Sequence, residues 1–258
     1  MKTAKDRLEE IKKEGYEIDF STIFTNSFEN YKKIALNAGL IFILIGIVAA
    51  AIIAIFIGLV IGFGDFNYDP ENLKAENFSA TGLIVYMFCV VLFAAIASPI
   101  TAGIIKMAHC ADKKEEFSIG TAFEYYKNPY FKEIFLATVI ISFFNVTISM
   151  LFEMVEIGFV GTIIGFLIGF FTFLAIPFII FGNLKAIEAI KASFAVISKQ
   201  ILLLFGLMII GILFSVIGFI GCCIGLFFTI PFIYSMYYCI YNEIIGVAES
   251  DENDDMNY

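Results

Sequence analysis

The segment DFNYDPENLKAE, residues 65–76, carries oxygen-bearing side chains at the spacing of a calcium-binding loop. The side chains at positions 1, 3, 5, 7 and 12 of the EF-hand pattern are Asp65, Asn67, Asp69, Glu71 and Glu76. Position 6 of that pattern needs the sharp turn of a glycine, but here it is Pro70, whose φ is fixed at a negative value. An acidic, solvated loop is therefore the favoured interpretation, and a weak calcium site is the alternative.

The histidine and cysteine residues do not form a reactive constellation. His109 is the single histidine of the chain, so a histidine metal cluster is excluded. Cys110 is its neighbour along the backbone, and adjacent residues cannot adopt the face-to-face geometry of a nucleophile and its base. Both are expected to be bystanders at a membrane interface, and the other cysteines lie in apolar runs as packing residues. The sequence thus predicts no catalytic residues, no cofactor and no enzyme activity.

The elements that must position all these residues follow from an apolar composition. Apolar residues make up 60% of the 258 residues, 31 of the residues are phenylalanine, and the mean hydropathy is +0.90. Ordinary soluble domains are ~45–50% apolar. A helix of ~20 apolar residues crosses the ~30 Å hydrocarbon core of a bilayer. The chain is therefore predicted to be an all-α integral membrane protein.

The apolar runs predict six transmembrane helices. They lie near residues 36–62, 80–105, 133–152, 157–181, 201–218 and 221–241. Glu153 and Glu156 lie between the third and fourth runs, and a tight hairpin at the interface accounts for them.

No ionisable residue lies near the centre of a span, which argues against a proton- or ion-coupled pump. Asn145 is the most costly polar residue to bury; we expect it to bond between helices, and the lining of a cavity is the alternative.

The basic residues determine the orientation. Apart from Lys74, all of them lie in residues 1–33, 106–132 and 185–199, on one side of the predicted spans. Basic loops are retained in the cytoplasm during insertion. Both termini are therefore expected in the cytoplasm. Residues 1–19 would form a charged, solvated N-terminal helix, and residues 248–258 an acidic, disordered tail.

Three similar segments each precede a predicted pair of spans. They read SFENYKK, AFEYYKN and SFAVISK, and they align on Phe28, Phe123 and Phe194. Their apolar residues recur at helical spacing, which is typical of helices that lie in the membrane plane. Each segment is thus predicted to be an amphipathic interfacial helix, anchored by its phenylalanine, that leads into a hairpin of two spans. The repeats divide a membrane domain of residues 20–247 near 20–107, 117–182 and 184–244.

A proline lies in the second span of each predicted hairpin: Pro99, Pro177 and Pro231. A proline removes one helical hydrogen bond. Within a bundle the freed backbone groups are satisfied by neighbouring helices or by serine and threonine side chains. Each proline is therefore expected to kink its span, and a functional hinge is the alternative.

Small residues form stripes at every fourth position of two spans. They are Gly46, Ala50, Ala54, Gly58 and Gly62 in the first span and Gly161, Gly165 and Gly169 in the fourth. Such stripes let helix backbones approach closely in a membrane, where lipid supplies no hydrophobic drive for association. Packing within the molecule is expected, and homo-oligomerisation through the first stripe is the alternative.

The last third of the chain resembles a known architecture. The resemblance rests on three motifs. They are the Ile-Pro-Phe of the fourth span, the amphipathic EAIKASF at 188–194, and the closing run with a second Ile-Pro-Phe at 224–232. They are similar to those of bacterial multi-pass proteins that resemble the membrane domain of some glycerophosphodiester phosphodiesterases. The resemblance implies a bacterial inner-membrane location and a supporting or lipid-facing role. Catalysis does not carry over, because one histidine cannot supply the metal and acid–base residues of that enzyme.

The sequence therefore favours a non-catalytic scaffold or accessory subunit of a membrane complex. Its expected partners are the lipid bilayer, a membrane protein and a bound lipid, with no role for nucleic acid. The alternative is a carrier or pore for a lipid or another apolar solute, with the proline-bearing spans around a cavity. A carrier requires a continuous hydrated path, whereas a scaffold is closed through the midplane.

Overall fold

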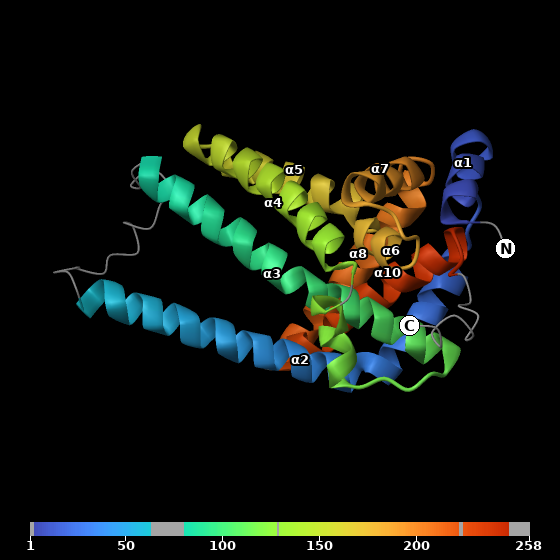
Figure 1. Cartoon of the computed structure of the whole chain (residues 1–258), viewed down its shortest axis with the longest axis horizontal. Helices are drawn as coiled ribbons and strands as arrows, with labels where there is room; N and C mark the ends of the chain where they lie inside the picture. Colours follow the sequence, from blue (N-terminus) through green and yellow to red (C-terminus); the bar gives the residue numbers. More distant parts are fainter. Residues whose placement is uncertain (1–2, 63–79, 128, 222–223, 248–258) are drawn as a thin grey trace.

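The computed structural model describes residues 3–62, 80–127, 129–221 and 224–247 (Figure 1). Within these ranges every regular element is a helix, which confirms the all-α prediction. The helices are α1 (Ala4–Glu14), α2 (Phe20–Gly62), α3 (Ala80–Lys113), η3 (Ile119–Tyr126), α4 (Phe131–Met154), α5 (Gly158–Thr172), α6 (Ala175–Ile180), α7 (Ala186–Ile197), α8 (Ile201–Ile217), η4 (Gly218–Gly221), α9 (Ile224–Thr229) and α10 (Pro231–Ile244).

Four helical segments in the described part are long and apolar enough to cross a membrane. They are Phe20–Ala51, Ile84–Lys113, Phe131–Met154 and Gly158–Ile180. A fifth would be the pair α7 and α8, which is bent by 104°. The protein is thus a multi-pass membrane protein. The predicted fifth and sixth spans are divided among α8, η4, α9 and α10, of which the longest, α8, has 17 residues.

The first predicted interfacial helix is not a separate element. α2 runs unbroken for 43 residues, so the segment around Phe28 continues into the first span. It begins at Phe20 because the N–H of Thr22 donates to the Asp19 carboxylate at 2.7 Å, a bond that also lowers the pKa of Asp19. No proline follows to stop the helix. At ~1.5 Å per residue α2 is about 65 Å long, roughly twice the thickness of the hydrocarbon core.

The other two segments take different forms. The segment around Phe123 is the short 3-10 helix η3, which Ser118 caps through a bond from the Gly120 N–H. η3 packs closely on α3, since a Cβ at Gly103 would lie 2.4 Å from the Cα of Ala122. The segment around Phe194 is α7, a separate amphipathic helix that meets α8 at a sharp bend. Only this third segment is an α-helix distinct from the helix that follows it.

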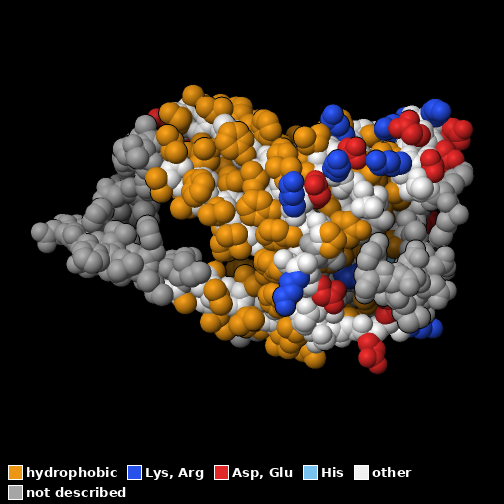
Figure 2. Space-filling view, in the orientation of Figure 1, with side chains coloured by type: hydrophobic (Ala, Val, Ile, Leu, Met, Phe, Trp, Pro, Cys, Tyr) orange, Lys and Arg blue, Asp and Glu red, His pale blue; other side chains and the backbone are white. Residues whose placement is uncertain are grey.

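Buried side chains gather at one end of the molecule. Among the described side chains of α2 the last buried one is Ile41, and in α3 burial begins at Ala95. Figure 1 shows α2 diverging from α3, while α3, α4 and α5 stay together. Figure 2 shows hydrophobic side chains over the diverging half and charged side chains at the other end. These two parts are called the apolar half and the charged end below.

The N-terminal helix is docked rather than solvated. One face of α1 is buried through Leu8 (8% exposed) and Ile11 (0%). The Arg7 Nε donates to the carbonyl of Ile244 at the end of α10, at 3.1 Å. Lys199 Nζ donates to the carbonyl of Lys12 at 2.8 Å. The sequence did not predict the docking of α1. Leu8 and Ile11 are a single i,i+3 apolar pair among many charged residues, and one such pair is a weak signal of burial.

The three prolines occupy different helical positions. α3 continues through Pro99. α5 ends at Thr172 and α6 resumes at Ala175, so Pro177 lies in the first turn of a new helix. Pro231 is the first residue of α10. A first-turn residue has no partner for its N–H in its own helix, so a proline there costs no helical hydrogen bond. At Pro177 and Pro231 the chain thus shows a break between two helices.

The stripe of the fourth span packs within the molecule at two of its three positions. A Cβ at Gly161 would lie 3.1 Å from the Cα of Ser149 in α4, and one at Gly165 would lie 2.9 Å from Oδ1 of Asn145. A Cβ at Gly169 would meet nothing within 4 Å. The α4–α5 hairpin therefore depends on the first two glycines.

In the first stripe, Gly46 contacts α9, since its Cβ would lie 3.3 Å from the ring of Phe227. Ala50 is exposed. The surroundings of Ala54, Gly58 and Gly62 lie outside the described side chains.

Substituting the glycines of α5 one at a time tests this packing. Gly165→Ala should lower the free energy of unfolding by about 1–3 kcal/mol, because the methyl group overlaps Asn145. Gly169→Ala should leave it unchanged or raise it by up to about 1 kcal/mol, since alanine is the better helix former. Reversible unfolding in mild detergent measures both. Equal effects of the two substitutions would contradict the packing of α5 on α4.

Candidate functional site

Polar side chains of α2, α3 and α10 meet inside the charged end. We call this group the α10 polar cluster, and it consists of Ser27, Asn30, His109, Asp112, Ser235, Tyr238 and Cys239. Positions 235, 238 and 239 share one face of α10 because they are three and four residues apart. With the exception of Asp112, every member is buried. The cluster is the candidate site with the most polar groups in the described interior.

Hydrogen bonds of the cluster join α10 to both of its neighbours. Ser235 Oγ donates to the carbonyl of Ser27 in α2 at 2.8 Å. Asn30 Nδ2 lies 3.6 Å from Cys239 Sγ and donates to it. On the other side, Tyr238 OH donates to Asp112 Oδ2 in α3 at 2.7 Å.

Aromatic rings close the cluster toward α6. The His109 ring lies 5.3 Å from that of Phe181 and 5.5 Å from that of Tyr238, measured between centroids. Tyr241 continues the group, with its ring 5.7 Å from Phe181 and 5.2 Å from Phe178. Three buried polar atoms have no hydrogen-bond partner among the described residues: Oγ of Ser27, Nδ1 of His109 and the hydroxyl of Tyr241.

The polar groups of this cluster form hydrogen bonds that join neighbouring helices. A nucleophile needs a base within hydrogen-bonding distance, and that base needs an orienting group. Here the Tyr238 hydroxyl is committed to Asp112, and Nδ1 of His109 is enclosed by rings without a partner. Among the described residues no group of three His, Cys, Asp or Glu side chains could hold a metal ion. The candidate calcium residues of the 65–76 segment lie outside the described residues.

His109 and Cys110 are buried within the protein. They are 8% and 5% exposed, because α3 continues to Lys113 and its last turns are covered by α6, α10 and η3. Asn30, a polar residue of the SFENYKK segment, is also buried, at 3% exposure. A heptad-like series in α2 could have revealed it, since Ile23, Ser27, Asn30, Ile34 and Ile41 all lie on the buried face.

Asn145 lies between helices. Its Nδ2 donates to the carbonyl of Gly165 at 3.1 Å, across the α4–α5 hairpin. Nearby, Thr147 Oγ1 contacts Met87 Sδ of α3 at 3.7 Å. Both side chains thus join α4 to a neighbouring helix.

The three aligned phenylalanines have different surroundings. Phe28 is half-buried in an aromatic group with Phe214 and Phe232, at centroid distances of 5.9 and 6.5 Å. Phe123 is 37% and Phe194 55% exposed. Phe194 also packs on Phe171 at 4.7 Å, so α7 covers the end of α5 while its outer face stays exposed.

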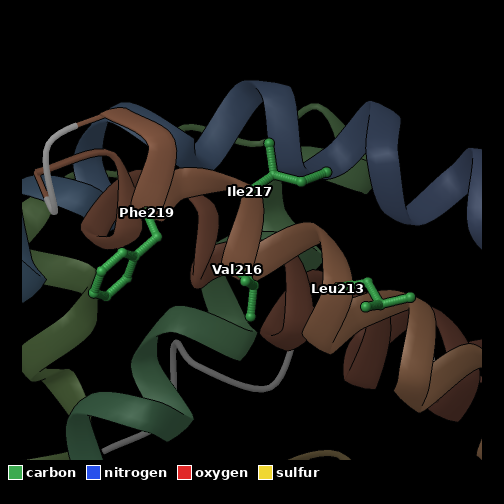
Figure 3. Close-up of a pocket in the computed structure, with 4 residues that line it drawn as sticks. All are labelled: Leu213, Val216, Ile217 and Phe219. Atoms are coloured by element: carbon green, nitrogen blue, oxygen red, sulfur yellow. The ribbon is translucent and has the colours of Figure 1, made fainter.

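A second candidate site is an apolar hollow beside α8 and η4 (Figure 3). Its lining residues are Leu213, Val216, Ile217 and Phe219. Their side chains are between 56% and 61% exposed, although all of them are hydrocarbon. Sequence analysis did not single out these residues, since large apolar side chains are common along every predicted span.

Comparison of the chain with protein-family models finds no match, and searches of curated proteins and of solved structures return no significant match.

Two tyrosines of α10 provide a matched test of the polar cluster. Tyr238→Phe should lower the free energy of unfolding by about 1.5–3 kcal/mol, because it removes a hydrogen bond to a carboxylate. Tyr241→Phe should be neutral or stabilising, because it removes a buried hydroxyl that has no partner. Thermal and chemical unfolding in mild detergent measure the two variants side by side. A loss of stability in Tyr241→Phe as large as in Tyr238→Phe would contradict this description.

Proposed function

We propose that this protein is a non-catalytic scaffold or accessory subunit of a membrane complex, and that α2 is the helix that contacts its partner. The observation that carries the proposal is the exposed small-residue surface of α2 in the apolar half, at Ala50 and Ala51. In a membrane, small residues mark surfaces where another helix can approach closely.

The shape of α2 supports this role. Its buried residues end at Ile41, and Gly46 makes the next close contact, with α9. Beyond that point α2 diverges from α3 (Figure 1). Ala54, Gly58 and Gly62 continue the sequence stripe from Ala50 at every fourth residue, so a partner helix could follow it for several turns. The partner is either a helix of another membrane protein or α2 of a second copy.

For the architecture we propose the six-span arrangement of three hairpins, with α7 as an interfacial helix and the breaks beside Pro177 and Pro231 as bends in the second helix of a pair. The charged end would face the cytoplasm of a bacterial cell, with the protein in the inner membrane. The concentration of basic side chains at that end supports this orientation (Figure 2). The Ile-Pro-Phe and EAIKASF motifs support the proposed kinship with the phosphodiesterase-associated membrane domain.

The alternative, a carrier for a lipid or another apolar solute, is favoured by the apolar hollow beside α8. A carrier also needs polar groups along its path. Asn145 and Thr147 of α4 are engaged in contacts between helices, which supports the scaffold over the carrier.

Purification in mild detergent followed by mass spectrometry tests the proposal. The wild-type protein should retain a stoichiometric membrane partner or a second copy. Ala50→Phe should lose it, because a large ring prevents close approach, while Ile84→Phe, at an exposed position of α3, should keep it. Both positions are exposed, so neither variant should lose stability. Retention of the partner by both variants, or the absence of any stoichiometric protein in the wild type, would overturn the proposal.

The orientation is tested by labelling single introduced cysteines in a variant that lacks the native ones. A membrane-impermeant maleimide should label Lys185→Cys only from the cytoplasmic side and Asn77→Cys only from the opposite side, because an odd number of spans would separate them. Labelling of both sites from the same side would exclude the proposed arrangement of spans.

A further inference from the structure

The bend between α7 and α8 has no helix-breaking residue of its own. The two helices meet at 104° and are separated only by Ser198, Lys199 and Gln200. None of these is glycine or proline, and lysine and glutamine are good helix formers. The N–H groups of Lys199 and Gln200 instead donate to carbonyls three residues back, at 3.1 and 3.2 Å, so α7 ends in a tight 3-10 turn. The local sequence thus permits a continuous helix, and the bend needs contacts from elsewhere in the chain.

The aligned segment of α2 shows the straight form. SFENYKK and SFAVISK align Lys33 of α2 with Lys199, and α2 runs through Lys33 unbroken. Lys33 Nζ donates to the carbonyl of Ala111 in α3, at 2.8 Å. Lys199 Nζ donates to the carbonyl of Lys12 in α1, at the same distance. The segment is therefore straight where its lysine meets α3 and bent where its lysine meets the N-terminal part of the chain.

Residues 3–17, which we call the N-terminal strap, hold the bend through three hydrogen bonds. The first is the bond from Lys199 to α1. The second runs from Gln200 Nε2 to the carbonyl of Tyr16, at 2.9 Å. The third is buried and runs in the other direction, from the Tyr16 hydroxyl to the carbonyl of Val196, at 3.0 Å. All three bonds fall on the last turn of α7 or on its linker to α8.

The strap itself is attached by a small contact area. Leu8 and Ile11 are the only buried side chains of α1. An ion pair joins Lys5 to Glu188 of α7 at 3.4 Å, but both side chains are more than half exposed. Exposed ion pairs contribute little to stability. The docking of α1 therefore depends on two apolar side chains, and it can open without unfolding α10, whose large rings are fully buried.

A movement of α7 would reach the fourth span. Ser193, on the buried face of α7, bonds to both sides of the break between α5 and α6. Its Oγ accepts from the N–H of Leu174 at 3.2 Å and donates to the carbonyl of Phe171 at 2.8 Å. The position of α7 and the geometry of this break are thus coupled.

We propose that the N-terminal strap is a conformational device that sets the angle between α7 and α8. With the strap docked, the two helices are held at the bend. With the strap released, they join through residues 198–200 into one helix, as α2 does, and Ser193 is withdrawn from the break in the fourth span. The proposal does not depend on the partner surface of α2.

The distance between two spin labels tests the proposal. Ile187→Cys in α7 and Leu213→Cys in α8 are labelled in a variant without the native cysteines, and both positions are exposed. At ~1.5 Å per residue they are about 39 Å apart along one continuous helix and roughly 25 Å apart across the 104° bend. Double electron–electron resonance in lipid nanodiscs should give only the shorter distance when the strap is otherwise unchanged.

A charge in the docking face should release the strap. Ile11→Asp places a carboxylate where the side chain is fully buried, so α1 should undock and the longer distance should appear. Lys13→Asp introduces the same side chain at an exposed position of α1 and should keep only the shorter distance. Hydrogen exchange of residues 4–14 should become faster in Ile11→Asp alone.

A second variant leaves the docking face intact. Tyr16→Phe combined with Gln200→Leu removes two of the three bonds to the bend and should also add the longer distance. Absence of the longer distance from both variants would overturn the proposal, whatever the state of α1. Equal proportions of the two distances with and without Ile11→Asp would overturn it as well.

Discussion

The packing of α10 between α2 and α3 at the charged end is the constraint on which the rest of the structure depends. α10 donates hydrogen bonds to both neighbours, through Ser235 to α2 and through Tyr238 to α3. Its large side chains Phe232, Tyr238 and Tyr241 are fully buried. A polar group buried away from water is costly unless it is paired, so these bonds specify one arrangement of the three helices. The docking of α1 over the ends of α7 and α10 extends the same packed region.

The apolar half can diverge because its solvent is hydrocarbon. In water, the exposed leucine, isoleucine and phenylalanine side chains of α2, α3 and α8 would collapse together to bury apolar surface. In a bilayer, lipid tails are as apolar as these side chains, so helices associate only where packing and polar bonds favour it. The α4–α5 hairpin meets that condition through Gly161, Gly165 and Asn145. Among the described side chains, no glycine or polar contact of this kind joins α2 to α3 in the part where the two helices separate.

Small exposed side chains mark one surface of the apolar half, at Ala50 and Ala51 of α2. Small residues let a second helix come close in a membrane. In the proposed scaffold function, protein contacts along α2 would therefore determine the partner.

The sequence by itself determined the class of the protein. Long apolar runs establish helices that can cross a membrane, because backbone groups in lipid must be bonded within their own segment. The same local patterns predicted a packing stripe at Gly161, Gly165 and Gly169, and the structure places the first two against α4 while a Cβ at Gly169 would meet nothing within 4 Å. Tertiary contacts decided what local pattern could not. Asn30 and His109 look interfacial in the sequence but are buried because α6 and α10, far along the chain, cover them. α1 looks solvated, yet its Leu8 and Ile11 are buried, and the helix contacts α7. Gly211 and Gly218 face inward, because Met236 of α10 and Gly225 of α9 lie against them. Burial is a property of neighbours that the fold brings together, and no periodicity within one segment reports which neighbours those are.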